Sequence, residues 1–301
     1  MKKTEKPIIA LMYDFDKTLS RSDMQDYGFI PALGMTPSEF WGETGRFQVE
    51  TGVERILSYM YTMVKLCKEK GIKLTRETLN NMGKNIDFFN GVTTWFDRIN
   101  AYGEELGVQV EHYIISSGTK EILEGCAIAK HFDYMFGCEF YFDPETKEPI
   151  WPKLAINYTM KTQFIYRIRK GSFDLTDDTT INTKVDNIRI PYTNMIYLGD
   201  GMTDIPCMQL VQNNGGHSIA IYSDKDESAL KKLLAEKRTN VCVKADYSKG
   251  SDLERVVKSI IQTVAAEANL KAQTKKLAEN LGIERINQPS KQRQLVFPFD
   301  A

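Results

Sequence analysis

Histidine is scarce in this chain, with only three among 301 residues. His112 and His217 each begin an apolar run that resembles a strand, and His131 ends a segment that resembles a helix. These positions fit structural roles, and metal sites of the zinc type need several histidine or cysteine ligands together. The sequence therefore predicts no histidine-rich metal site.

Paired cysteines are also missing. The chain has five cysteines, an odd number, and no two of them form a C-x-x-C pair. Each lies among apolar or helix-forming residues, which favours free thiols over a disulfide framework. We therefore expect a protein of the reducing cytoplasm.

Long runs of one kind of residue are absent too. The formal net charge is −1 and there is no long basic block, so a non-specific grip on nucleic-acid phosphates is not expected. No apolar segment is long enough to span a membrane. The apolar run after Lys2 and Lys3 is short and ends in acids, which argues against a cleaved secretion signal. We expect a cytoplasmic protein whose partner is a small molecule.

The apolar run from Ile8 to Tyr13 ends in two acids, Asp14 and Asp16, which flank Phe15. A continuous apolar run is typical of a central parallel strand covered by helices on both faces. Ligands bind at the carboxyl ends of such strands, where both carboxylates would face one pocket. Taken alone, the pattern equally fits a surface turn.

A second apolar run begins at Tyr113 and is followed by Ser116, Ser117 and Gly118. The stretch that begins at Thr119 has a helix-like pattern, and the free N–H groups of a helix start can bind an anion. The same hydroxyls equally fit ordinary helix caps.

Lys161 begins a stretch with apolar residues at helical spacing. It would bring an ammonium group to a helix start. Lys153, Lys170 and Lys184 lie in the same part of the chain and compete for this role.

A third apolar run ends at Gly199 and is followed by Asp200, Gly201 and Asp204. Carboxylates are ligands that Mg²⁺ prefers, and the two glycines would let the loop turn tightly around an ion. Because a proline follows two residues after Asp204, this acid equally fits a helix cap.

In this order, the segments resemble the four motifs of the haloacid dehalogenase (HAD) superfamily, most nearly its phosphoserine-phosphatase-like branch. The resemblance covers roughly residues 7 to 262. It implies an α/β fold, with a doubly wound, Rossmann-like parallel sheet as the core and an inserted α-helical cap. We expect the core over residues 1–20 and 90–265, the cap over residues 21–89, and a C-terminal helix and tail over residues 266–301.

The resemblance also implies roles for the motif residues. Asp14 matches the nucleophile that forms an aspartyl phosphate, and Asp16 matches the general acid and base. Ser116, with Ser117 beside it, and Lys161 match the groups that bind the phosphate.

A magnesium ion is the cofactor that the resemblance implies. Asp14 and Asp200 would bind it through carboxylates, and Asp16 through its backbone carbonyl. Asp204 would be a further ligand or would hold the site together.

About ninety residues separate the first two motifs, far more than one crossover helix needs. We expect them to form a cap that closes over the site, with helices over residues 24–30, 52–70 and 75–85. Re-entry to the core is expected at residues 88–92.

Three cap residues are candidates for substrate specificity. Asp23 lies nine residues after Asp14, where phosphoserine phosphatases carry an acid for the substrate amine, but it equally fits a helix cap. Arg46 or Arg55 would bind a substrate carboxylate through two hydrogen bonds, although either equally fits surface charge.

Three other segments carry structural expectations. Residues 143–149 are typical of a hairpin tip between two strands. The polar stretch 171–187 is expected to be a surface excursion or an oligomer contact. The apolar tip at residues 295–299 would dock on its own protein or on a second copy in a homo-oligomer.

The sequence thus predicts a magnesium-dependent phosphatase acting on a small phosphorylated metabolite, with phosphoserine as one candidate substrate. A phosphomutase or phosphotransferase is an alternative, although Lys17-Thr18 after Asp16 favours a hydrolase. A catalytically silent protein that binds phosphorylated metabolites is the other.

Overall fold

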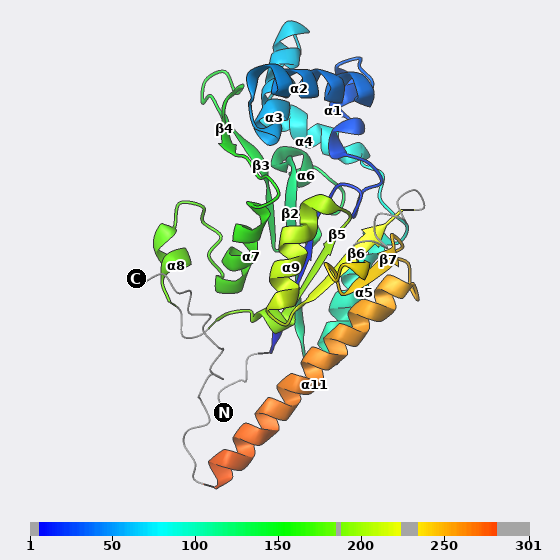
Figure 1. The fold of residues 1–301 in the computed structure, drawn as a ribbon, viewed down its shortest axis with the longest axis vertical. Helices are drawn as coiled ribbons and strands as arrows, with labels where there is room; N and C mark the ends of the chain where they lie inside the picture. The colour runs from blue at the N-terminus through cyan, green and yellow to red at the C-terminus, as the bar shows by residue number, and fades with distance from the viewer. Residues whose placement is uncertain (1–5, 185–187, 224–233, 282–301) are drawn as a thin grey trace.

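A seven-stranded sheet forms the centre of the computed structural model, which describes residues 6–184, 188–223 and 234–281 (Figure 1). The strand order is β4-β3-β2-β1-β5-β6-β7, and all neighbouring strands are parallel except β3 and β4. The strands are β1 (Ile8–Tyr13), β2 (Gln109–Thr119), β3 (Tyr134–Phe142), β4 (Pro149–Leu154), β5 (Met195–Gly199), β6 (His217–Tyr222) and β7 (Val241–Lys244). The predicted α/β fold with a mostly parallel sheet is confirmed.

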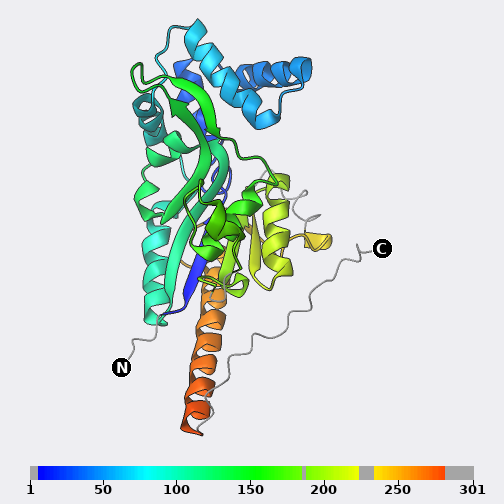
Figure 2. The same cartoon turned by 90° about the vertical axis from the view of Figure 1, so that its left-hand side faces the viewer.

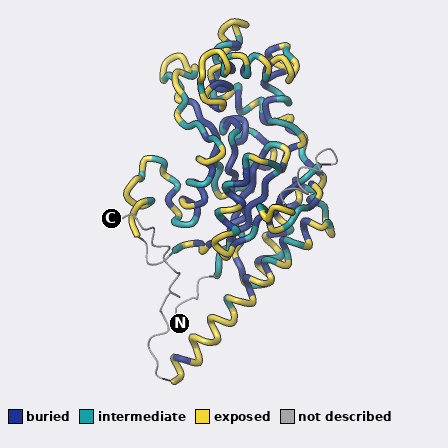
Figure 3. The backbone as a smooth tube through the Cα atoms, in the orientation of Figure 1, coloured by how far each residue is buried: buried dark blue, intermediate teal, exposed yellow. Residues whose placement is uncertain are grey.

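Helices cover both faces of the sheet, which explains the nearly continuous burial of its central strands (Figures 2 and 3). Helix α5 (Val92–Glu105) packs on one face with α11 (Asp252–Asn280) beside it. Helices α7 (Lys161–Lys170) and α9 (Ile205–Asn213) pack on the opposite face. The C-terminal half of α11 extends beyond the sheet and is mostly exposed (Figure 3).

The topology places a ligand site at the end of β1. This strand pairs with β2 on one side and with β5 on the other. The chain runs outward from β1 through β2 and β3, and later returns to β5 on the far side. Ligands of doubly wound sheets bind at this kind of switch point, beyond the carboxyl ends of the strands. Asp14 and Asp200 directly follow the two strands that meet there.

A helical insertion between β1 and β2 lies over the carboxyl ends of the strands (Figure 1). Its helices are α1 (Phe29–Ala32), α2 (Pro37–Thr51), α3 (Arg55–Glu69) and α4 (Arg76–Met82). Helices α2 and α3 pack on each other, as do α4 and the core helix α6 (Lys120–Glu124). The predicted insertion after the first motif is confirmed.

Helix α2 lies where the hydrophobic pattern predicted no helix. It has few buried residues, so its apolar periodicity is weak. The local signal is a capping box between Thr36 and Glu39 with Pro37 in the first turn. The single helix predicted over residues 24–30 is wrong, because a 3-10 turn over Met24–Asp26 precedes α1.

The predicted hairpin is confirmed, since β3 and β4 pair antiparallel and Asp143 accepts two backbone N–H groups at its tip. The polar stretch 171–187 contains α8 (Asp178–Asn182), and its last three residues lie outside the described residues. The apolar tip at 295–299 lies wholly outside them. Within the described ranges, no helix is both long and apolar enough to cross a bilayer.

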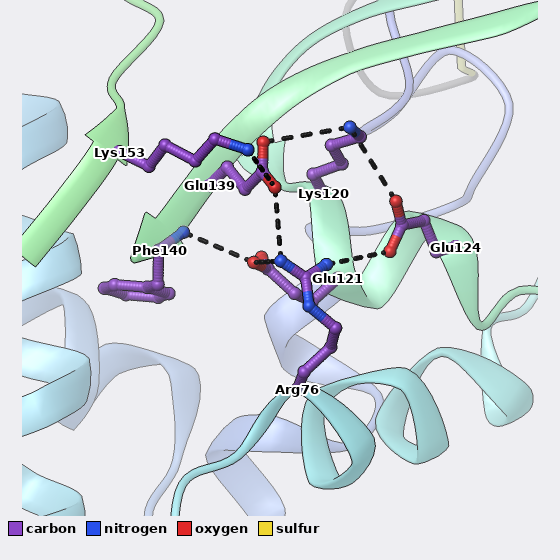
Figure 4. Close-up of polar contacts among 7 residues, drawn as sticks. All are labelled: Arg76, Lys120, Glu121, Glu124, Glu139, Phe140 and Lys153. Carbon is purple, nitrogen blue, oxygen red and sulfur yellow. Dashed lines mark hydrogen bonds and ion pairs between the residues drawn. The ribbon is translucent and has the colours of Figure 1, made fainter. Parts of the chain in front are cut away.

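A cluster of charges joins the cap to the core on the side of the sheet near β3 (Figure 4). Arg76 of α4 contacts Glu121 at 3.4 Å, Glu124 at 3.2 Å and Glu139 at 3.1 Å. Lys153 of β4 also contacts Glu139, at 2.9 Å. Glu121 and Glu139 are buried, so these cations compensate carboxylates that would otherwise be costly to bury.

Glu121 is the most constrained acid of this cluster. It is completely buried; one oxygen accepts the N–H of Phe140 at 3.3 Å, and the other has no partner among the described residues. Burial raises the pKa of Glu121 to about 7, although the charge of Arg76 opposes this shift. The folded protein therefore binds a proton here more tightly than the unfolded chain, and loses stability as the pH rises toward the folded-state pKa.

Replacing Glu121 by glutamine should remove this pH dependence. We expect Glu121→Gln to unfold like the wild type at pH 5, and to be more stable by about 1–3 kcal/mol at pH 8. Urea unfolding at both pH values measures the difference. Glu77→Gln, at an exposed position of α4, is the matched control and should change little. A wild-type-to-variant difference that is the same at both pH values would contradict the assignment.

Candidate active site

Asp14 stands where the central strand reaches the site. Its backbone N–H donates to the carbonyl of Leu198 at 2.8 Å, so pairing with β5 continues one residue past β1. The side chain is only 8% exposed. A carboxylate at this depth needs a cation or hydrogen-bond donors close by.

Lys161 supplies that cation from the first residue of α7. Its Nζ atom donates to Asp14 Oδ1 at 2.9 Å and to Asp204 Oδ1 at 2.8 Å, and the side chain is buried. Burial alone would lower the pKa of Lys161, but the two carboxylates raise it above its ordinary value. Among the competing lysines, Lys153 contacts Glu139 at the cap junction instead.

Three carboxylates gather at the ends of β1 and β5. Oxygen atoms of Asp14, Asp200 and Asp204 lie within 4.8 Å of one another. Burial and the neighbouring acids raise the pKa of Asp200 to about 8, and burial and Asp204 raise that of Asp14 to about 6. The single ammonium group of Lys161 faces these three acids, so one positive charge cannot balance the negative charge of the three carboxylates.

Asp204 has one carboxylate oxygen with hydrogen-bond partners and one without. Its Oδ1 atom accepts from Lys161 and from the hydroxyl of Tyr197, the latter at 2.7 Å. Its Oδ2 atom is buried and has no partner among the described residues. An orphaned carboxylate oxygen beside two further acids fits a hard divalent cation, because Mg²⁺ prefers carboxylate oxygens. The residues present therefore fit a magnesium site.

Asp16 is separate from this acid group and faces the cap. Its Oδ1 atom accepts the backbone N–H of Met24 at 2.7 Å. Burial, followed by the charge of Asp23, raises the pKa of Asp16 well above its ordinary value. A Cβ atom at Gly118 would lie 2.0 Å from Cε of Met24, at the end of a flexible side chain, and 3.2 Å from Oδ2 of Asp16.

The two serines at the end of β2 differ in their surroundings. Ser116 is completely buried, and its hydroxyl accepts the backbone N–H of Gly118 at 2.9 Å. Ser117 lines the cavity, and its hydroxyl has no partner among the described residues. Its carbonyl accepts a hydrogen bond from Tyr59 of the cap at 2.8 Å. The hydroxyl of Ser117 is thus the one left without a protein partner.

A cavity of about 820 Å³ lies between the core and the cap. Asp14, Asp16, Lys161 and Asp200 line its inner end. The cap contributes the aromatic, polar and charged side chains of Asp23, Gln25, Trp41, Thr44, Gln48, Arg55 and Tyr59. The cavity therefore joins the acid group to a pocket whose lining is set largely by the cap.

The three cap candidates lie in different surroundings. Asp23 makes no capping hydrogen bond, and contacts the Nζ atom of Lys17 at 2.9 Å. Arg46 does not line the cavity, and pairs at 3.1 Å with an acid of its own helix. Arg55 lines the cavity and donates to the hydroxyl of Tyr158 at 3.5 Å.

Three residues of the site were not predicted from the sequence. The hydroxyl of Tyr197 donates to Asp204. The feature of the sequence that could have indicated this residue is its position two residues before Gly199 on the same strand. Tyr158 and Lys17 line the cavity, but no spacing rule links either of them to the cap.

No family model matches the chain. A Borreliella burgdorferi protein, described only as uncharacterized, is 30% identical over 276 residues, which span 82% of this chain and 94% of that protein. The chain belongs to the same family as that protein. This relationship defines a shared family without itself assigning an activity.

Solved structures show which fold this chain has. A substrate-bound phosphoserine phosphatase complex superposes with a TM-score of 0.54 at 17% identity, over 85% of this chain and 99% of that one. A HAD family hydrolase from Salmonella enterica serovar Typhi gives a TM-score of 0.51 at 16% identity, over 80% of this chain and 69% of that one. The chain has the fold of HAD hydrolases, with a helical cap after the first motif.

The two glycines beside Asp200 are not equivalent. A Cβ atom at Gly199 would lie 2.5 Å from Cγ of Asp204, whereas one at Gly201 would meet open space. Gly201 also has an extended backbone with a φ of −156°. Neither glycine has a positive φ, so the backbone conformation of the loop does not require them. Glycine is required at position 199 alone, by the close packing of Asp204.

Alanine substitutions test this difference. We expect Gly199→Ala to lower the free energy of unfolding by about 1–3 kcal/mol, because Asp204 must move. Gly201→Ala is the matched control and should stay within about 0.5 kcal/mol of the wild type. Chemical unfolding of both variants measures the effect. Equal losses in the two variants would contradict the packing described for Asp204.

Proposed function

We propose that this protein is a magnesium-dependent phosphatase that hydrolyses a small phosphomonoester through an aspartyl-phosphate intermediate. The observation that carries the proposal is the group of Asp14, Lys161, Asp200 and Asp204, of which all but the partly exposed Asp200 are buried. It lies at the switch point of a fold shared with HAD hydrolases. The fold alone would not license this function, because similar folds host many chemistries.

Asp14 is the proposed nucleophile. One of its oxygens is held by Lys161, and a carboxylate oxygen attacks phosphorus while the bond to the leaving oxygen breaks. Asp16 gives a proton to that leaving oxygen and then takes one from an incoming water molecule. The water oxygen attacks phosphorus, the bond to Asp14 breaks, and inorganic phosphate leaves with Asp14 restored.

The geometry around Asp16 supports its role. The backbone N–H of Met24 holds one oxygen, and the second lies beside Gly118 at the cavity. Met24 belongs to the cap segment, so the position of the proposed acid depends on the cap. Catalytic acids need such fixed placement within hydrogen-bond reach of the reacting oxygen.

The phosphate oxygens need donors and positive charge. We assign the hydroxyl of Ser117 and the ammonium group of Lys161 as direct contacts, while the hydroxyl of Ser116 accepts the backbone N–H of Gly118 and so holds the turn beside them. Preorganised donors of this kind stabilise charge that develops during phosphoryl transfer.

Magnesium would be held by Asp14, Asp200 and Asp204, with the backbone carbonyl of Asp16 as a further ligand. When bound, the ion neutralises negative charge on the transferring phosphoryl group. Closure of the cap excludes bulk water. Arg55 is the proposed contact for a carboxylate of the substrate.

A phosphate-release assay tests the proposal. A panel of phosphorylated metabolites and p-nitrophenyl phosphate is incubated with magnesium and either wild type or Asp14→Asn. We expect wild-type release that chelation of magnesium abolishes, and a loss of about 1,000-fold or more in the variant. Asp87→Asn, at an exposed position outside the cavity, is the control for the same chemical change. Full magnesium-dependent activity in Asp14→Asn, with deamidation excluded, would overturn the nucleophile.

A further inference from the structure

An ion pair occupies the cap side of the cavity. Lys17 and Asp23 both line the cavity, and Nζ of Lys17 lies 2.9 Å from Oδ1 and 3.1 Å from Oδ2 of Asp23. Both carboxylate oxygens of Asp23 are thus engaged by the chain's own ammonium group. Any ammonium group on a substrate would have to compete for the same acid.

The backbone around Lys17 fixes this arrangement. Lys17 has a φ of +58°, in the left-handed region that residues other than glycine seldom adopt. The turn is held because the carbonyl of Phe15 accepts N–H groups from Leu19 at 2.9 Å and Ser20 at 3.1 Å. The backbone of this turn sets the direction in which the Lys17 side chain leaves the chain, and the side chain then extends to Asp23.

Asp23 has a special place among the acids of the cavity. The other acids in its lining are Asp14, Asp16 and Asp200, which lie at the end where the phosphate would bind. Within the described lining, Asp23 is therefore the remaining acid that could face a leaving group. Because Lys17 neutralises it, the leaving-group end offers an ammonium ion no free carboxylate.

Arg55, the cation on the same side of the cavity, differs from Asp23 because it has no partner of opposite charge among the described residues. Arg55 lines the cavity, and its recorded contact is the long hydrogen bond of 3.5 Å to Tyr158. No ion pair to Arg55 occurs in the part of the chain that the structure describes. A guanidinium group without an acidic partner is suited to bind a carboxylate through two parallel hydrogen bonds.

We propose that the cavity selects phosphomonoesters whose leaving group carries a carboxylate but no ammonium group, as in a phosphorylated hydroxy acid. The inference rests on the proposed phosphatase function. Lys17 and Asp23 exclude the amine, and Arg55 binds the carboxylate. The pair is partly exposed, with side-chain exposures of 51% and 29%, so the discrimination should be about fivefold rather than absolute.

Three substrates that differ by one group at a time test the selectivity. O-phosphoserine carries a carboxylate and an ammonium group, 3-phosphoglycerate replaces the ammonium by a hydroxyl, and glycerol 3-phosphate also replaces the carboxylate by a hydroxymethyl group. We expect kcat/KM for 3-phosphoglycerate to exceed each of the others by at least about fivefold.

Variants then assign the discrimination to residues. Lys17→Met should free Asp23, and raise the ratio of phosphoserine to 3-phosphoglycerate turnover about fivefold. Asp23→Asn leaves Lys17 unpaired, so this ratio should fall. Arg55→Met should lower the ratio of 3-phosphoglycerate to glycerol 3-phosphate. Effects common to all substrates cancel in these ratios, which therefore report specificity and not folding or general catalysis.

p-Nitrophenyl phosphate, which has neither group, separates the two proposals. If it is hydrolysed with magnesium while phosphoserine equals or exceeds 3-phosphoglycerate in kcat/KM, the selectivity is overturned and the phosphatase function stands. An unchanged ratio in Lys17→Met would also overturn the role of the pair. Absence of magnesium-dependent release from p-nitrophenyl phosphate and from the three metabolites would overturn the phosphatase function itself.

Discussion

The ammonium group of Lys161, buried between Asp14 and Asp204, is the interaction on which the rest of the site depends. Removing an ion from water costs several kcal/mol, and only close opposite charges offset that cost. Lys161 therefore links three elements: the end of β1, the start of α7 and the turn after β5. The hydroxyl of Tyr197 completes the coordination of the shared Asp204 oxygen.

Lys161 does not balance all the negative charge around it, and this imbalance favours the binding of a cation. Asp14, Asp200 and Asp204 carry more potential negative charge than one lysine can balance, and one Asp204 oxygen has no partner among the described residues. A divalent cation would supply the missing charge, and a phosphate ester would be attracted once it is present. The same features that make the group costly in isolation thus suit it to phosphoryl transfer.

The cap contacts the core in two places that affect the site, one at the cavity and one near β3. Near the cavity, the N–H of Met24 holds Asp16 and the hydroxyl of Tyr59 holds the carbonyl of Ser117. At the junction near β3, Arg76 ties α4 to buried acids of the core. A movement of the cap would therefore displace both the proposed acid and the end of β2. This coupling gives the cap a role in arranging the reacting groups as well as in covering them.

The sequence predicted the strand ends well, although an apolar run that stops at acids equally fits a surface turn when taken alone. The order of the four segments along the chain decided between the two explanations. The sequence also predicted that Lys161 begins a helix, although its contact with Asp14 required the fold. Helix α2 was missed, because it buries too little apolar surface to produce a clear periodic pattern.

Two further features depend on local geometry that no spacing rule contains. The pairing of Lys17 with Asp23 requires a left-handed backbone at a lysine, where sequence preferences would place glycine. The difference between Ser116 and Ser117 depends on which hydroxyl meets the N–H of Gly118. Neighbouring residues of the same type cannot be separated by composition or pattern.

The measurement that tests the central claim most directly is the trapping of a phosphoryl group on Asp14. Asp16→Asn is mixed with p-nitrophenyl phosphate and magnesium, because this leaving group needs little protonation while hydrolysis of the intermediate still needs the missing base. After acid quenching, mass spectrometry of the peptides should locate a phosphoryl adduct on Asp14. An adduct on another residue, or release of p-nitrophenol with no adduct at any stage of the first turnover, would contradict the account.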